Sequence, residues 1–169
     1  MRKYILRYIS IIDRMNFCVG RVTMYMIFVM IGVLFYSSVS KTFFFPTLWT
    51  LEFAQFLMVS YFLLGGAYSL QLKGHVRMDL LYSQGSDLTK CKWDTFTSFF
   101  LIAYLIVLLY GSLSSLTYAI EYGERSYSSW RPYMWPVKLV MATGIFLMLL
   151  QAISQFFKDF AAARGKPLQ

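Results

Sequence analysis

Four long stretches without a charged residue constrain the fold of this chain more than any other feature. They cover residues 22–40, 53–72, 95–120 and 139–157. An α-helix rises 1.5 Å per residue, so about 20 mostly apolar residues cross the hydrocarbon layer of a membrane. Only 14% of the residues are charged, whereas soluble proteins average about 25%. The sequence therefore predicts an all-α integral membrane protein with four transmembrane helices.

The positions of the prolines and polar segments set the expected limits of these helices. All four prolines lie outside the apolar stretches, and no internal repeat is visible. We expect one membrane domain over residues 1–169, with spans at about 20–40, 50–72, 93–121 and 137–158. Tryptophan residues near the span ends fit the aromatic belts of membrane borders.

The distribution of basic residues predicts the orientation. If the N-terminus is cytoplasmic, twelve of the 16 Lys and Arg residues lie on the cytoplasmic side and four lie outside. Lys and Arg are retained on the cytoplasmic side of membranes, so both termini should be cytoplasmic. The same asymmetry accounts for the net charge of +8. It indicates contact with membrane phospholipids and does not require nucleic acid.

Two further segments are expected to lie along the membrane border. In residues 2–16, Ile5, Ile9 and Ile12 fall near one helical face, whereas Arg7 and Arg14 fall on another. This pattern predicts an interfacial helix leading into the first span. A frayed basic tail is the alternative. Residues 75–85 form the second expected interfacial segment.

The residues needed for enzyme chemistry are missing from the spans. His75 is the single histidine and lies in a loop, and Cys18 and Cys91 form no CxxC pair. His75 and Asp79 could share a helical face, but two ligands are too few for a closed metal site. No phosphate-binding loop or nucleophile motif is found. We expect no enzyme activity, no cofactor and no metal.

Small and polar residues in the spans instead suggest helix packing. In lipid, helices associate through small residues and hydrogen bonds. Gly65 and Ser69 form one small pair and Gly111, Ser115 and Ala119 a longer stripe. The candidates for contact with a partner protein are Trp49, Glu52, Gly65, Ser69, Gly111, Ser115, Ala119 and Gln151. Two alternatives stay open, since the stripes could pack within the chain and Glu52 could simply oppose a helix dipole.

Two strings of residues resemble a known family. In TLWTLEFAQFLMVSYFLLGGAYSLQLKGHVRMDLLY, residues 47–82, the second span opens with Trp49 and Glu52 and has a Gly/Ala-rich end. A cytoplasmic motif follows it, composed of Lys73, Gly74, His75, Arg77 and Asp79. The second string, residues 124–155, begins in a loop whose candidate residues are Arg125, Ser126, Trp130, Pro132 and Trp135. Both strings are similar to the small Q subunit, DctQ-like, of tripartite ATP-independent periplasmic (TRAP) transporters.

The resemblance implies a non-catalytic subunit in the bacterial inner membrane. In that family a periplasmic binding protein captures an organic acid, and a large membrane subunit moves it inward with sodium by an elevator motion. The Q subunit would be a fixed scaffold for the large subunit, and the loop would face the periplasm. The substrate stays unspecified. The alternatives are a small proton-coupled multidrug exporter and an accessory subunit of another membrane complex.

Overall fold

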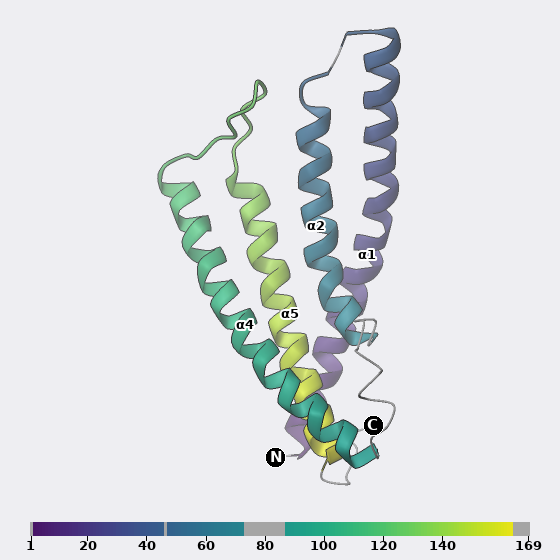
Figure 1. The fold of residues 1–169 in the computed structure, drawn as a ribbon, viewed down its shortest axis with the longest axis vertical. Helices are drawn as coiled ribbons and strands as arrows, with labels where there is room; N and C mark the ends of the chain where they lie inside the picture. Colours follow the sequence, from purple (N-terminus) through teal and green to yellow (C-terminus); the bar gives the residue numbers. More distant parts are fainter. Residues whose placement is uncertain (1, 46, 73–86, 164–169) are drawn as a thin grey trace.

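Four long helices make up most of the chain in the computed structural model, which describes residues 2–45, 47–72 and 87–163. They are α1 (Arg2–Phe43), α2 (Thr50–Gln71), α4 (Asp87–Glu121) and α5 (Trp135–Ala163) (Figure 1). Each is long and apolar enough to cross a membrane. The predicted class, an all-α membrane protein with four spanning helices, is therefore confirmed.

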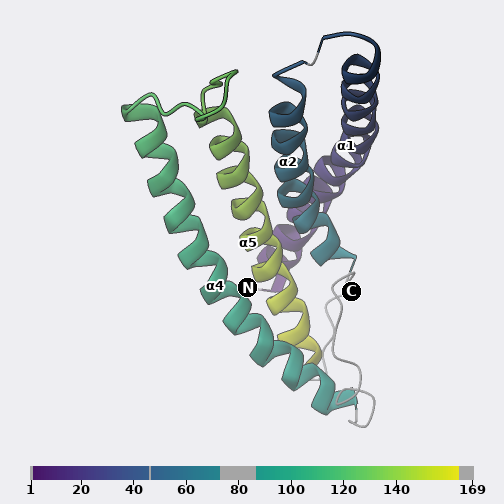
Figure 2. The same ribbon diagram turned by 45° about the horizontal axis from the view of Figure 1, so that its top comes forward.

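The helices form a row in the order α4, α5, α2, α1. Helix α4 packs on α5, α5 packs on α2, and α2 packs on α1, while α1 also contacts α5. Figure 1 shows α4 and α1 on opposite sides of the molecule, and Figure 2 agrees. The outer helices α4 and α1 therefore pack mainly against the two middle helices, and a broad surface of each outer helix is not covered by the rest of the described chain.

Helix α4 packs on α5 along a single seam, lined at its centre by buried residues and at its edges by half-buried ones. Its buried residues Leu105, Ser112 and Ala119 recur every seven positions, which is the spacing of a coiled-coil seam. Leu105 packs with Ile145 and Ala152 of α5 in the apolar core. The rest of the helix circumference lies outside this seam.

Helix α1 also packs through buried residues that are multiples of seven positions apart, but most of these residues are polar. Ile9, Asn16, Thr23 and Ser37 are buried and also differ by multiples of seven. Ser37 shares a hydrogen bond of 2.9 Å with Thr50 of α2. In a membrane, such hydroxyl and amide groups are sheltered on the protein side while apolar residues face outward.

The middle of the row is held by a close approach of α5 to α2. A Cβ atom at Gly144 would lie 3.0 Å from the Leu63 carbonyl carbon and 3.1 Å from its oxygen. At Gly66, a Cβ atom would meet the Met148 sulfur at 2.8 Å. Glycine at these two positions therefore allows the helices to pack closely.

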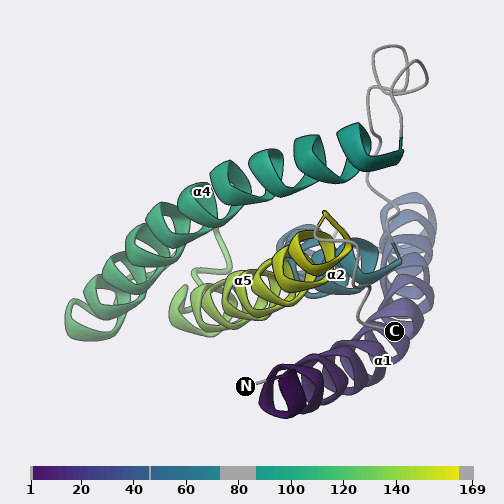
Figure 3. The ribbon, with the colours of Figure 1, turned by 90° about the horizontal axis from the view of Figure 1, so that it is seen from below.

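The first helix is longer than the span expected for it. Its 42 residues correspond to roughly 63 Å, about twice the hydrocarbon thickness of a membrane. The segment predicted at residues 2–16 is the beginning of this helix. In Figure 3 the N-terminal part of α1 runs sideways from the rest of the helix.

Some of the predicted features lie outside the described residues. These are the second interfacial segment, 75–85, and the motif of Lys73, Gly74, His75, Arg77 and Asp79. They stay predictions from the sequence.

Candidate functional site

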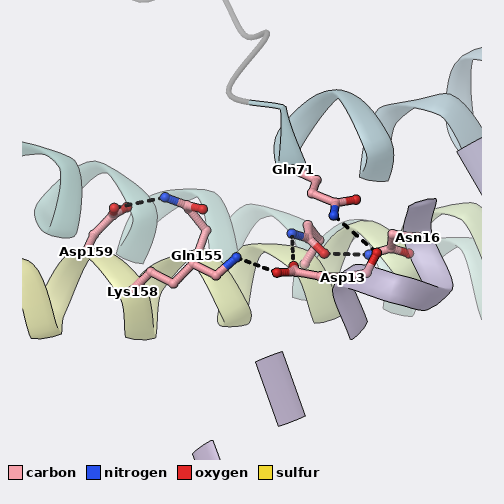
Figure 4. A network of polar contacts seen from close by, with 7 residues as sticks. Asp13, Asn16, Gln71, Gln155, Lys158 and Asp159 are labelled. Atoms are coloured by element: carbon pink, nitrogen blue, oxygen red, sulfur yellow. Dashed lines mark hydrogen bonds and ion pairs between the residues drawn. The ribbon is translucent and has the colours of Figure 1, made fainter. Parts of the chain in front are cut away.

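A cluster of polar side chains joins three helices near the chain termini; we call it the Asp13 cluster (Figure 4). The carboxylate of Asp13 accepts a hydrogen bond from Gln151 Nε2 at 3.0 Å and pairs with Lys158 Nζ at 2.7 Å. The Asp13 carbonyl accepts a bond of 3.1 Å from Gln71 Nε2. One residue of α1 therefore holds both α5 and α2.

Burial makes the Asp13 cluster a strong constraint on helix positions. Asn16 donates from Nδ2 to Gln151 Oε1 at 2.6 Å, and both residues are essentially inaccessible to solvent. Unpaired buried polar groups cost about 1–3 kcal/mol each, so the helices must stay in register to keep these bonds. The remaining oxygens Asn16 Oδ1 and Gln71 Oε1 have no hydrogen-bond partner in the described part of the chain.

A second polar cluster lies at the opposite end of the helices from the Asp13 cluster; we call it the loop cluster. It lies in the connection between α4 and α5, where Ser126 donates from Oγ to Glu52 Oε1 of α2 at 3.3 Å. Glu124 pairs with Lys138 at the start of α5. Lys138 Nζ also lies 3.5 Å from the carbonyl oxygen of Ser115 in α4. The cluster thus connects α2, α4 and α5.

The loop itself folds back as a short hairpin. Arg125 and Tyr133 form an isolated antiparallel bridge, and the Arg125 guanidinium lies 4.3 Å from the centre of the Tyr133 ring. The Ser126 amide donates to the Pro132 carbonyl at 3.0 Å. Trp130 and Trp135 remain exposed beside this hairpin. All five predicted loop residues therefore lie in or next to one folded unit.

The candidates on α2 have different surroundings. Trp49 precedes the helix, and its ring centre lies 6.1 Å from that of Tyr36 and 6.0 Å from that of Phe53. Gly65 is half-buried, and a Cβ atom there would lie 3.8 Å from Thr23 of α1. Ser69 is also half-buried. Gly65 therefore faces a helix of its own chain.

The predicted stripe on α4 is divided between inside and outside. Ala119 is fully buried and Ser115 is half-buried, whereas Gly111 is exposed with no atom within 4 Å of a Cβ position. Of these three residues, only Gly111 presents an open surface. Gln151, the candidate on α5, is enclosed in the Asp13 cluster.

The central residue of the Asp13 cluster was not among the candidates from the sequence. Asp13 is the single acidic residue before Glu52, and it stands among basic residues on a helix that enters the membrane. A lone carboxylate in such a position needs a partner, and this signal could have identified it.

Comparison with known protein families identifies a match over most of the chain. Residues 30–162 match the family described as tripartite ATP-independent periplasmic transporters, DctQ component. No curated protein matches the chain significantly. The matched region begins within α1 and includes the loop cluster and most of α5.

Proposed function

Because the chain belongs to the family of DctQ components of tripartite ATP-independent periplasmic transporters, we propose that it is the small, non-catalytic membrane subunit that scaffolds the large transport subunit. In this proposal the large subunit moves an organic acid with sodium by an elevator motion. A periplasmic binding protein delivers the acid, and the present chain stays fixed in the bacterial inner membrane.

The exposed face of α4 is the observation that best supports a partner subunit. Tyr104, Tyr110, Gly111 and Ser114 are exposed in the central part of this helix. Tyrosines that face lipid gather at the membrane borders, whereas hydroxyl groups and glycine in a span favour contact with another helix. We therefore assign the face with these four residues, the α4 face, to the large subunit.

The ionisable groups support a structural role over transport by this chain alone. Asp13 pairs with Lys158 at one end of the helices, and Glu124 pairs with Lys138 at the opposite end. Glu52 stands in the first turn of α2 and contacts Ser126. Carriers place such groups near the middle of the membrane, where ions and substrate bind. An exporter with a central carboxylate is accordingly disfavoured.

The loop cluster would give the binding protein a stable surface in the periplasm. The contact between Glu52 and Ser126 fixes the hairpin to α2, and the Glu124–Lys138 pair fixes it to α5. Exposed aromatic rings such as Trp130 and Tyr127 would then supply apolar contact area.

The test compares two glycines that both face open space. Gly111 lies on the α4 face and Gly32 lies on the exposed side of α1, and neither has an atom within 4 Å of a Cβ position. Gly111→Leu should reduce co-purification of the large subunit at least several-fold, because a bulky side chain separates closely packed helices. Gly32→Leu should not. Unchanged recovery of the large subunit with Gly111→Leu would contradict the assignment of the α4 face.

The orientation has a separate test. Most Lys and Arg residues lie in the segments on the same side of the spans as the two termini. Because such residues are retained on the cytoplasmic side, we propose that both termini are cytoplasmic. A reporter enzyme that is active only in the cytoplasm should work when fused to either terminus. Activity of a periplasm-specific reporter at the C-terminus would reverse this orientation.

A further inference from the structure

The first half of α1 packs beside the uncharged stretches of α5 and α2 and does not project straight beyond them. Tyr8 lies 13 residues before Arg21, which is roughly 20 Å along a helix, and the first uncharged stretch begins directly after Arg21. Yet the Tyr8 hydroxyl donates to the carbonyl of Leu150 at 3.3 Å. Leu150 lies inside the uncharged stretch of α5, seven residues before its end.

The contacts of α2 agree with this placement. Gln71, in the last turn of α2, bonds to Asp13, and the Tyr68 ring lies 6.0 Å from the ring of Phe17. The end of the α2 span therefore lies beside residues 13–17 of α1. Since α1 enters its uncharged stretch only after Arg21, these contacts place residues 4–21 beside the ends of the other spans. We call them the border segment.

The border segment has one apolar stripe that the row of helices does not cover. Ile9 and Ile12 are buried against the row, but Tyr4 is 80% exposed and Ile11 is 57% exposed. Cys18, seven residues after Ile11, is also exposed. Tyr4, Ile11 and Cys18 repeat every seven residues, so they form a continuous line along the helix.

A line of arginines runs beside this apolar stripe. Arg7, Arg14 and Arg21 are exposed and also repeat every seven residues, each three positions after a member of the apolar stripe. At 3.6 residues per turn, the two lines are roughly 60° apart on the helix surface. None of these arginines pairs with a carboxylate in the part of the chain that the structure describes, and the Arg21 guanidinium lies 4.7 Å over the ring of Phe17.

We propose that the border segment is a binding surface for anionic phospholipids. The line of Tyr4, Ile11 and Cys18 enters the boundary between acyl chains and headgroups, and the three arginines bind headgroup phosphates. A helix at a membrane border has this combination of an apolar face and flanking cations, and guanidinium groups form charge-assisted hydrogen bonds with phosphate. Because α1 continues directly into a span, lipid is necessarily next to its surface.

This surface belongs to the chain itself and does not depend on the proposed role in the transporter. Lipid binding by the border segment would fix the tilt of α1. It would act together with the contacts of Asp13 to α5 and α2, which fix the position of α1 within the protein. Anionic lipids attract each basic residue near the surface by about 1 kcal/mol, so three arginines favour them over zwitterionic lipids.

The first experiment measures membrane depth. The full chain with Cys18→Ala, which keeps the stripe apolar, and Cys91→Ser receives a nitroxide label at Ile11→Cys or, as the matched control, at the exposed neighbour Ser10→Cys. In bilayers that contain phosphatidylglycerol, the label at position 11 should be relaxed mainly by oxygen and the label at position 10 mainly by a water-soluble nickel complex. Equal access of the nickel complex to both positions, or shielding of position 11 from both reagents, would refute insertion.

The second experiment measures lipid selectivity. The chain is extracted from bilayers with equal amounts of phosphatidylglycerol and phosphatidylcholine, and the retained lipids are counted by mass spectrometry. The triple variant Arg7→Gln, Arg14→Gln, Arg21→Gln should lose most of the preference for phosphatidylglycerol, with a change of about five-fold for each arginine. The control Lys41→Gln, at the exposed far end of α1, should keep it. An unchanged preference in the triple variant would overturn the proposal.

Discussion

At Gly144, helix α5 approaches the backbone of α2 so closely that even a Cβ atom would crowd it. The obstacle is the peptide group of Leu63, and a backbone cannot move aside as a flexible side chain can. From the sequence alone, Gly144 could not be distinguished from Gly65 or Gly111, because all three are glycines within apolar stretches. Their surroundings differ only once the helices are placed.

This contrast predicts different effects of the same substitution. Gly144→Ala should destabilise the chain by about 1–3 kcal/mol, the usual cost of overpacking. Gly111→Ala should change stability by less than about 0.5 kcal/mol, because its Cβ atom enters open space. Unfolding of the purified chain in detergent measures both. Equal stability of the two variants would show that α5 and α2 are not packed this closely.

The sequence was sufficient to predict that the four helices exist, but not which side of each helix is buried. The length of the uncharged stretches was sufficient to predict four spans, because a membrane admits few other structures. The buried side of α1 was harder to predict because it includes Asn16, Thr23 and Ser37 while apolar residues such as Phe28 and Phe35 face outward. A search for apolar faces, suited to proteins in water, selects the wrong side of such a helix.

The pairing of α1 with α5 can be tested through Asp13 and Lys158. Each side chain is 26% exposed, so partial screening limits their interaction to about 0.5–1 kcal/mol. Asp13→Asn and Lys158→Gln should each destabilise the chain, and the double variant should lose less than the sum. Lys41→Gln, at an exposed helix end, should be neutral. Strict additivity of the two changes would mean that the pair does not couple the helices.

The whole molecule is a row of helices with two wide outer surfaces, and this shape suits a scaffold. A closed bundle would cover its own helices, whereas α1 and α4 each pack through one seam and remain open to lipid or protein. The sequence could indicate that a partner was needed, because its spans have packing residues and lack central charges. It could not show which stripes are used internally, since this depends on the order of the helices in the row.

The most direct test of the central claim is transport in reconstituted vesicles. Vesicles contain the large subunit alone, the present chain alone, or both, with the binding protein and a labelled organic acid outside and a sodium gradient inward. We expect sodium-dependent uptake when both membrane subunits are present and none with the present chain alone. Uptake by this chain without the large subunit, or full uptake when this chain is omitted, would contradict the proposed role as a non-catalytic scaffold.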